Sequence, residues 1–209
     1  MNQALIEYIN SEILPRYDAF DAAHRRDHVQ MVIDQSLAIA KHYDVNEDMV
    51  LAIAAFHDTG IAVDRKTHHL VSGKIVRADA QLRQWFTAEQ IETMAQAVED
   101  HRASSDHEPR SIYGKIVAEA DRNIVPDSII RRSLQYGLQH YPEQDKEGQF
   151  GRVLKHMHDK YFYGGYLKLW FPESPNVQRL EDLRAIIADE TLLRQKFEEI
   201  YATLTQPKA

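Results

Sequence analysis

Six side chains with the chemistry of metal ligands fall at or near the ends of predicted helices. They are His28, His57, Asp58, His69, His101 and Asp121. Imidazole and carboxylate groups together suit Mn, Fe, Co, Ni or Zn ions, and an oxygen-richer set suits Mg. Helical bundles commonly build metal sites from side chains on facing helices. The sequence therefore predicts a divalent-cation site of this kind.

The dipeptide His57-Asp58 is the most informative of these positions. It follows the apolar run 52–56 and precedes a threonine and a glycine, which supplies a helix stop. His57 continues the helical spacing of Val50 and Ile53, so its imidazole is expected on the buried face. Burying a histidine beside an aspartate is unfavourable unless both groups are satisfied, and a divalent cation would satisfy both.

A second His-Asp dipeptide, His158-Asp159, offers an internal control. It falls inside a predicted helix between Met157 and Tyr161, with no glycine stop after it. No later predicted helix offers an inward aspartate as a further ligand. We therefore predict a structural role for His158.

Helical periodicity extends over almost the whole chain, and no strand-like alternation persists. Apolar residues recur at helical spacing in segments 3–14, 27–40, 46–58, 69–80, 87–101, 111–121, 127–141, 150–161 and 176–204. Asn46, Ser111 and the pair Thr87 and Gln90 are typical helix N-caps. The predicted fold class is all-α, and the last segment is expected to be one long helix.

Composition excludes several kinds of chemistry. The chain has 209 residues and no cysteine, which rules out disulfides, thiolate catalysis and Cys-based zinc sites. It shows neither a signal-peptide pattern nor an apolar run near the ~20 residues of a membrane span. We therefore expect a cytoplasmic protein without a membrane partner. The net charge of −7 argues against a polymeric nucleic-acid partner.

The order of the candidate ligands resembles that of a known family. His28, then His57-Asp58, then Asp121 is similar to the pattern of the HD-domain superfamily of metal-dependent phosphohydrolases. The dipeptide with its following Thr-Gly is the most specific part. The resemblance implies that these four side chains hold one divalent cation, whose water attacks a phosphoester, and that Asp58 is also catalytic. Binding to the cation would lower the pKa of that water from about 15.7 toward ~7.

The resemblance also implies a domain layout. We expect a single all-α domain over residues 1–209, with an HD-domain helical bundle containing the metal site over 20–125. Residues 126–209 would then form a C-terminal helical extension.

Two further histidines have two roles open to them under this resemblance. His69 and His101 either bind a second metal ion or contact the phosphate, and His68 can exchange roles with His69. The chain departs from the family where Ile61 replaces a frequent lysine and where the GYP motif of cyclic-dinucleotide phosphodiesterases is absent. No general acid is assigned.

Basic side chains beside the predicted ligands are the candidates for binding the phosphate. They are Arg102, Arg25, Lys115, Arg122 and Lys74. Arg102 is the first choice because it follows His101 directly and because a guanidinium can bind two phosphate oxygens at once.

The sequence thus predicts a metal-dependent phosphohydrolase that acts on a small, nucleotide-like phosphoester, and it is compatible with a homodimer. Two alternatives stay open: a di-iron oxygenase of the same superfamily, and a regulatory module that binds metal and nucleotide without turnover. Metal content and assays with Mn²⁺, Mg²⁺ and Co²⁺ would separate the three.

Overall fold

The computed structural model describes residues 1–20, 26–102, 105 and 107–206. Within these ranges every regular element is a helix, which confirms the predicted all-α class. The chain divides into two compact units. The first contains Met1–Arg122 and Trp170–Ser174, and the second contains Asn123–Leu169 and the chain from Pro175 onward. Among the described helices, none combines the length and the apolar character needed to cross a membrane.

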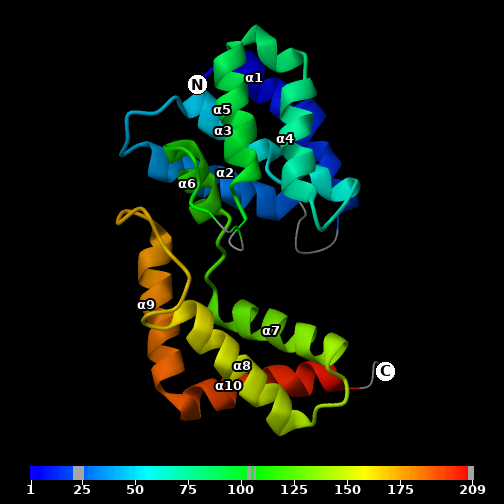
Figure 1. Cartoon of the computed structure of the whole chain (residues 1–209), viewed down its shortest axis with the longest axis vertical. Coiled ribbons are helices and arrows are strands. Elements are labelled where there is room, and N and C mark those ends of the chain that lie inside the picture. Colours follow the sequence, from blue (N-terminus) through cyan, green and yellow to red (C-terminus); the bar gives the residue numbers. More distant parts are fainter. Residues whose placement is uncertain (21–25, 103–104, 106, 207–209) are drawn as a thin grey trace. The chain divides into compact units, whose positions relative to one another are not determined.

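The first unit contains all the predicted metal ligands, and Figure 1 shows its helices. Its elements are α1 (Gln3–Tyr8), η1 (Ile9–Ile13), η2 (Leu14–Ala19), α2 (Arg26–Ala40), α3 (Glu47–Phe56), η3 (Thr59–Ala62), α4 (His68–Ala78), η4 (Gln81–Gln84), α5 (Ala88–Glu99) and α6 (Ile112–Ala120). The predicted caps are confirmed: Thr87 and Gln90 form a capping box on α5, and Ser111 caps α6.

Helix α3 is the central helix of this unit. Every residue after its first two is buried, and it packs against α2, α5 and α6. Asn46 caps its first turn, as predicted, by accepting two backbone N–H groups. A helix that is apolar on all sides belongs inside a protein. The residues that follow its C-terminus, His57 and Asp58, are therefore delivered to the interior.

The N-terminal segment packs on this core as three short helical pieces rather than one regular helix. The wider π-helical turn η1 joins α1 to the 3₁₀ turn η2. Pro15, which has no backbone N–H, prevents a regular α-helix from continuing there. Leu5, Ile9, Ile13 and Tyr17 are all buried in the main core.

The second unit has its own apolar core. Its helices are α7 (Pro126–His140), α8 (Lys146–Tyr161), α9 (Pro175–Ala188) and α10 (Glu190–Thr205). The prediction of one long helix over 176–204 is wrong, because the helix divides at Asp189. The carboxylate of Asp189 accepts the N–H of Leu192 and caps α10. Aspartate favours such caps over helix interiors because its short side chain competes for backbone N–H groups.

A five-residue segment between α8 and α9, Trp170–Ser174, belongs to the first unit; we call it the strap. Its Phe171 is buried in an apolar cluster with residues of α2, α3 and α6. The backbone N–H groups of Trp170 and Phe171 donate to the buried carboxylate of Glu119 in α6, at 2.5 and 3.3 Å. The strap is therefore held by both apolar packing and a buried acceptor.

Candidate metal centre

The end of α3 aims the imidazole of His57 at Asp58. His57 is fully buried, and its Nδ1 lies 2.8 Å from the carbonyl oxygen of Ala54. A carbonyl can only accept, so Nδ1 carries the proton, and Nε2 offers a lone pair in the neutral ring. That Nε2 lies 3.3 Å from Asp58 Oδ2. It has no hydrogen-bond partner of good geometry in the described part of the chain, which is the state of a nitrogen suited to a metal ion.

Asp58 lies at the centre of four imidazoles. Its Oδ2 faces His57 and His28, with the His28 Nε2 at 3.8 Å. Its Oδ1 faces the other two rings, with His68 Nε2 at 3.2 Å and His101 Nε2 at 3.5 Å. Each carboxylate oxygen thus faces one pair of imidazole nitrogens.

A second carboxylate completes the first pair. Asp121, immediately after α6, has its Oδ1 3.1 Å from His28 Nε2 and 3.8 Å from His57 Nε2. The side chain of Asp121 is 27% exposed and that of Asp58 only 4%. The structure therefore brings together the four ligands predicted from the sequence, and the group opens toward solvent at Asp121.

The second pair, His68 and His101, is held in the same way as His57. The Nδ1 of His68 lies 2.9 Å from the Arg65 carbonyl, and the Nδ1 of His101 lies 2.6 Å from the Val98 carbonyl. Their Nε2 atoms are 3.2 Å apart. In neutral rings two lone pairs would face each other at this distance, so a proton or a cation is needed between them.

The charges of the cluster favour a bound cation. Burial lowers the pKa of His57, but the charges of Asp58 and Asp121 outweigh it and raise this pKa to about 9. Burial raises the pKa of Asp58, yet His57 and the other imidazoles hold it far below its usual range. Burial raises the pKa of Asp121, but the His28 hydrogen bond and the charges of His57 and His101 together lower it to about 2. A divalent cation that displaces the His57 proton would meet two ionised carboxylates and imidazole lone pairs, which is a donor set suited to transition metals.

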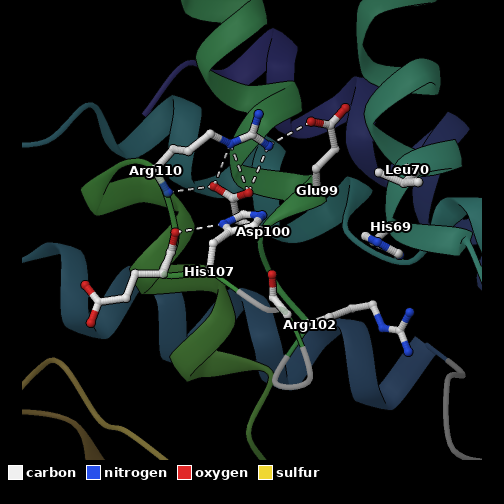
Figure 2. A pocket seen from close by; sticks show the side chains of 9 residues that line it. His69, Leu70, Glu99, Asp100, Arg102, His107 and Arg110 are labelled. Carbon is white, nitrogen blue, oxygen red and sulfur yellow. Dashed lines mark hydrogen bonds and ion pairs between the residues drawn. The ribbon is translucent and has the colours of Figure 1, made fainter.

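The structure places His68, and not His69, in this cluster. His68 is the first residue of α4, and one residue along a helix turns the side chain by ~100°. His69 instead lines a neighbouring cavity of about 810 Å³ (Figure 2). Burial and the charge of Arg102 lower its pKa to about 4, so its ring is neutral near pH 7.

The cavity in Figure 2 has a mixed polar lining. Its lining residues are His69, Leu70, Glu99, Asp100, Arg102, Ser105, His107, Glu108 and Arg110. The buried Asp100 binds Arg110 through the backbone N–H at 2.7 Å and the guanidinium Nε at 3.0 Å. Arg102 donates to the Lys66 carbonyl at 2.9 Å. Because the His69 and His68 rings are 5.7 Å apart, the cavity adjoins the cluster.

The remaining basic candidates have varied surroundings. Arg25 lies outside the described residues. Lys74 is exposed on α4, and Lys115 lies 3.9 Å from a Glu108 carboxylate oxygen. The Arg122 guanidinium stacks on the ring of Trp170 at 4.3 Å, so it contacts the strap.

This all-α unit brings four histidines and two aspartates together at its helix ends, and groups of these side chains could hold a metal ion. The family comparison makes this specific, because residues 25–123 match the family model of the HD domain. The predicted resemblance to the HD-domain superfamily is therefore confirmed over this segment. Comparison with curated proteins and with solved structures gave no match.

Proposed function

We propose that this protein is a metal-dependent phosphohydrolase that cleaves a small phosphoester at a two-cation site. The observation that carries the proposal is the placement of Asp58, whose two carboxylate oxygens each face a separate pair of imidazole nitrogens. Such a carboxylate is suited to bridge two metal ions, and two-metal sites are frequent in phosphoester hydrolysis.

Each cation has its own set of side chains under this proposal. His28, His57, Asp58 and Asp121 would hold the first. Asp58, His68 and His101 would hold the second, which leaves more of its coordination positions for substrate and water. The nitrogen-rich donor sets suit Mn, Fe, Co, Ni or Zn better than Mg.

The substrate would approach from the side where the cluster meets solvent and the cavity. A bound divalent cation supplies an acidified water and withdraws charge from a phosphoryl oxygen. Arg102 would bind a remaining phosphate oxygen, and the neutral His69 would donate or accept a hydrogen bond at the cavity wall. The carboxylates of Asp58 and Asp121 would keep the positively charged cations beside the phosphate. Lys74, Lys115 and Arg122 would contribute at most at longer range.

The cavity supports a small substrate of limited charge. A volume of about 810 Å³ lies within the range of small-molecule sites. Three carboxylates line it, those of Glu99, Asp100 and Glu108, and two of these bind Arg110. This balance favours a phosphomonoester of nucleotide size over a polyanionic polymer.

The test is a metal titration followed by a substrate panel. Metal-free protein would be loaded with Mn²⁺, Co²⁺, Mg²⁺ or Fe²⁺, its bound metal counted, and phosphate release measured on nucleotides and other phosphomonoesters. We expect two transition-metal ions per chain and release of phosphate. Tight nucleotide binding without any phosphate release would favour the regulatory module instead.

The placement of Asp58 between two pairs of imidazoles would also suit a di-iron oxygenase, which is the second candidate. The same titration separates the two functions. Activity that requires two irons and consumes oxygen would establish the oxygenase, whereas oxygen-independent phosphate release with Mn²⁺ or Co²⁺ would establish the hydrolase.

A further inference from the structure

Tyr17 lies outside the segment that matches the HD domain, yet its hydroxyl reaches the end of α3. Its side chain is fully buried, and its ring centroid is 6.4 Å from that of His57. The hydroxyl donates to the carbonyl of Ala55 at 2.8 Å and accepts the backbone N–H of Asp58 at 3.3 Å. It therefore contacts the backbone of the residue at the centre of the cluster.

This hydroxyl stands between two groups that often bond each other directly. Ala55 and Asp58 are three residues apart, the spacing of the 3₁₀ hydrogen bonds that tighten the last turn of many helices. With the hydroxyl between them, both groups are satisfied and Asp58 leaves the helix with φ −107° and ψ 5°.

Two neighbouring carbonyls at the end of α3 are capped by residues close in sequence. The His57 Nδ1–H donates to the Ala54 carbonyl, and the Thr59 hydroxyl donates to the Phe56 carbonyl, each at 2.8 Å. The Ala55 carbonyl between them receives its hydrogen bond from Tyr17, 38 positions earlier in the chain. The backbone at Asp58 thus depends on a distant side chain.

We propose that Tyr17 is a positioning residue that fixes the backbone of Asp58 and thereby directs its carboxylate between the two imidazole pairs. This inference rests on the proposed function, because it assigns Tyr17 a role toward the cation ligand Asp58. In Tyr17→Phe the ring remains but the hydroxyl is lost. The freed Ala55 carbonyl and Asp58 N–H then bond each other, which rotates the peptide and moves the carboxylate away from His68 and His101.

The experiment compares Tyr17→Phe with Tyr8→Phe in the full chain. Tyr8 comes from the same N-terminal segment, and its hydroxyl donates to the Asp79 carboxylate at the end of α4. Each variant loses one hydroxyl, with two hydrogen bonds lost at Tyr17 and one at Tyr8, but only Tyr17 contacts Asp58. Metal-free proteins would be titrated with Co²⁺ and followed by calorimetry and by the visible absorption of the bound ion.

We expect Tyr17→Phe to bind Co²⁺ at least ~10-fold more weakly and to change the visible Co²⁺ spectrum. Tyr8→Phe should match the wild type in both. A purely structural role would lower the thermal stability of both variants and leave the spectrum unchanged.

The outcomes separate this inference from the proposed function. If the wild type binds no Co²⁺, the proposed function fails and the role of Tyr17 fails with it. If the wild type binds Co²⁺ and the two variants behave alike, only the role of Tyr17 is overturned.

If Tyr17→Phe fails to fold, a measurement on the wild-type protein still tests the inference. In wild-type protein with ¹³C-labelled tyrosine rings, Zn²⁺ should shift the Tyr17 resonances and leave those of Tyr8 in place. If Zn²⁺ binds and the Tyr17 resonances stay where they are in the metal-free protein, as those of Tyr8 do, the inference is overturned.

Discussion

His57-Asp58 ends helix α3, whereas His158-Asp159 lies within helix α8. Neighbouring residues inside a helix point ~100° apart, so the second pair cannot converge. Asp159 binds Lys155 one turn away at 2.6 Å, and the His158 ring contacts Phe162. Both of these contacts lie within or just beyond the helix that carries the pair.

The first pair differs because the helix stops there. Asp58 leaves the helix, so its carboxylate lies 3.3 Å from the imidazole of the residue before it. Residues on or directly after four further helices, α2, α4, α5 and α6, then supply partners to the pair. A His-Asp dipeptide thus becomes a candidate metal site through the break in the backbone and through its partners, and composition alone does not distinguish the two.

The strongest way to break this comparison is to remove one aspartate from each pair. Asp58→Ala should lower metal affinity by more than ~100-fold, beyond the loss usual for residues behind the ligands, and should abolish phosphate release. Asp159→Ala and His158→Ala should leave metal content and activity unchanged. Metal content after desalting measures the effect. Equal losses from Asp58→Ala and Asp159→Ala would remove the distinction.

Substitutions of two neighbouring histidines in α4 test which side chains complete the metal site around His57-Asp58. His68→Ala should reduce bound metal from two ions to one per chain and lower turnover strongly. His69→Ala should keep both ions and raise KM, since it lines the cavity. Calorimetric stoichiometry decides the matter, and a normal count of two in His68→Ala would contradict the bridged arrangement.

Two glycines, one near each dipeptide, differ in how closely other atoms pack around them. A Cβ on Gly60 would come within 2.2 Å of the His68 carbonyl oxygen and 2.8 Å of the Ser72 nitrogen. Gly60→Ala should therefore displace the start of α4 and weaken the second cation by about 10-fold, a loss typical of disturbed support behind a ligand.

Gly151 in α8 provides the control, because a Cβ there meets nothing within 4 Å. Gly151→Ala should stabilise the helix by up to ~1 kcal/mol and leave metal binding intact. Thermal unfolding and cation titration of both variants check the pair, and unchanged second-cation affinity in Gly60→Ala would be the contrary result.

The smallest expected effect is a pH dependence that arises from the first dipeptide. The pKa of His57 is raised from 6.5 to about 9 in the folded state. Its contribution to stability is thus fully present below pH 6.5 and is lost as the pH rises toward 9. The melting temperature of metal-free protein should fall by several degrees over this window.

Bound metal should remove this pH effect, because the cation replaces the proton on the cluster. Thermal unfolding with and without Mn²⁺ between pH 6 and 8.5 measures both trends. A metal-free melting temperature that rises through this window would show that His57 is not protonated in the folded chain.

Much of this arrangement can be predicted from the sequence, because the signals that determine it lie close together in the chain. The apolar run before His57 and the caps at Asn46 and Thr87 each depend on residues within a few positions. These signals correctly indicate helix positions, and the order of the histidines and aspartates correctly predicts the match of residues 25–123 to the HD-domain model.

Other features depend on contacts that periodicity does not encode. The choice between His68 and His69 turns on where α4 begins relative to Asp58, and a shift of one residue redirects the side chain. The break at Asp189 lies in a segment whose apolar spacing continues on both sides. Tyr17 gives no local signal, since its partners lie 38 and 41 positions away.

The strap has a practical meaning for how this domain is delimited. The match to the HD family ends at residue 123, but the apolar cluster formed by α2, α3 and α6 is filled by Phe171. Homology therefore marks a shorter segment than the one that folds. A truncated protein cut at the family boundaries would lack both Tyr17 and Phe171. A minimal version that keeps these contacts has to combine stretches that are separate in the sequence.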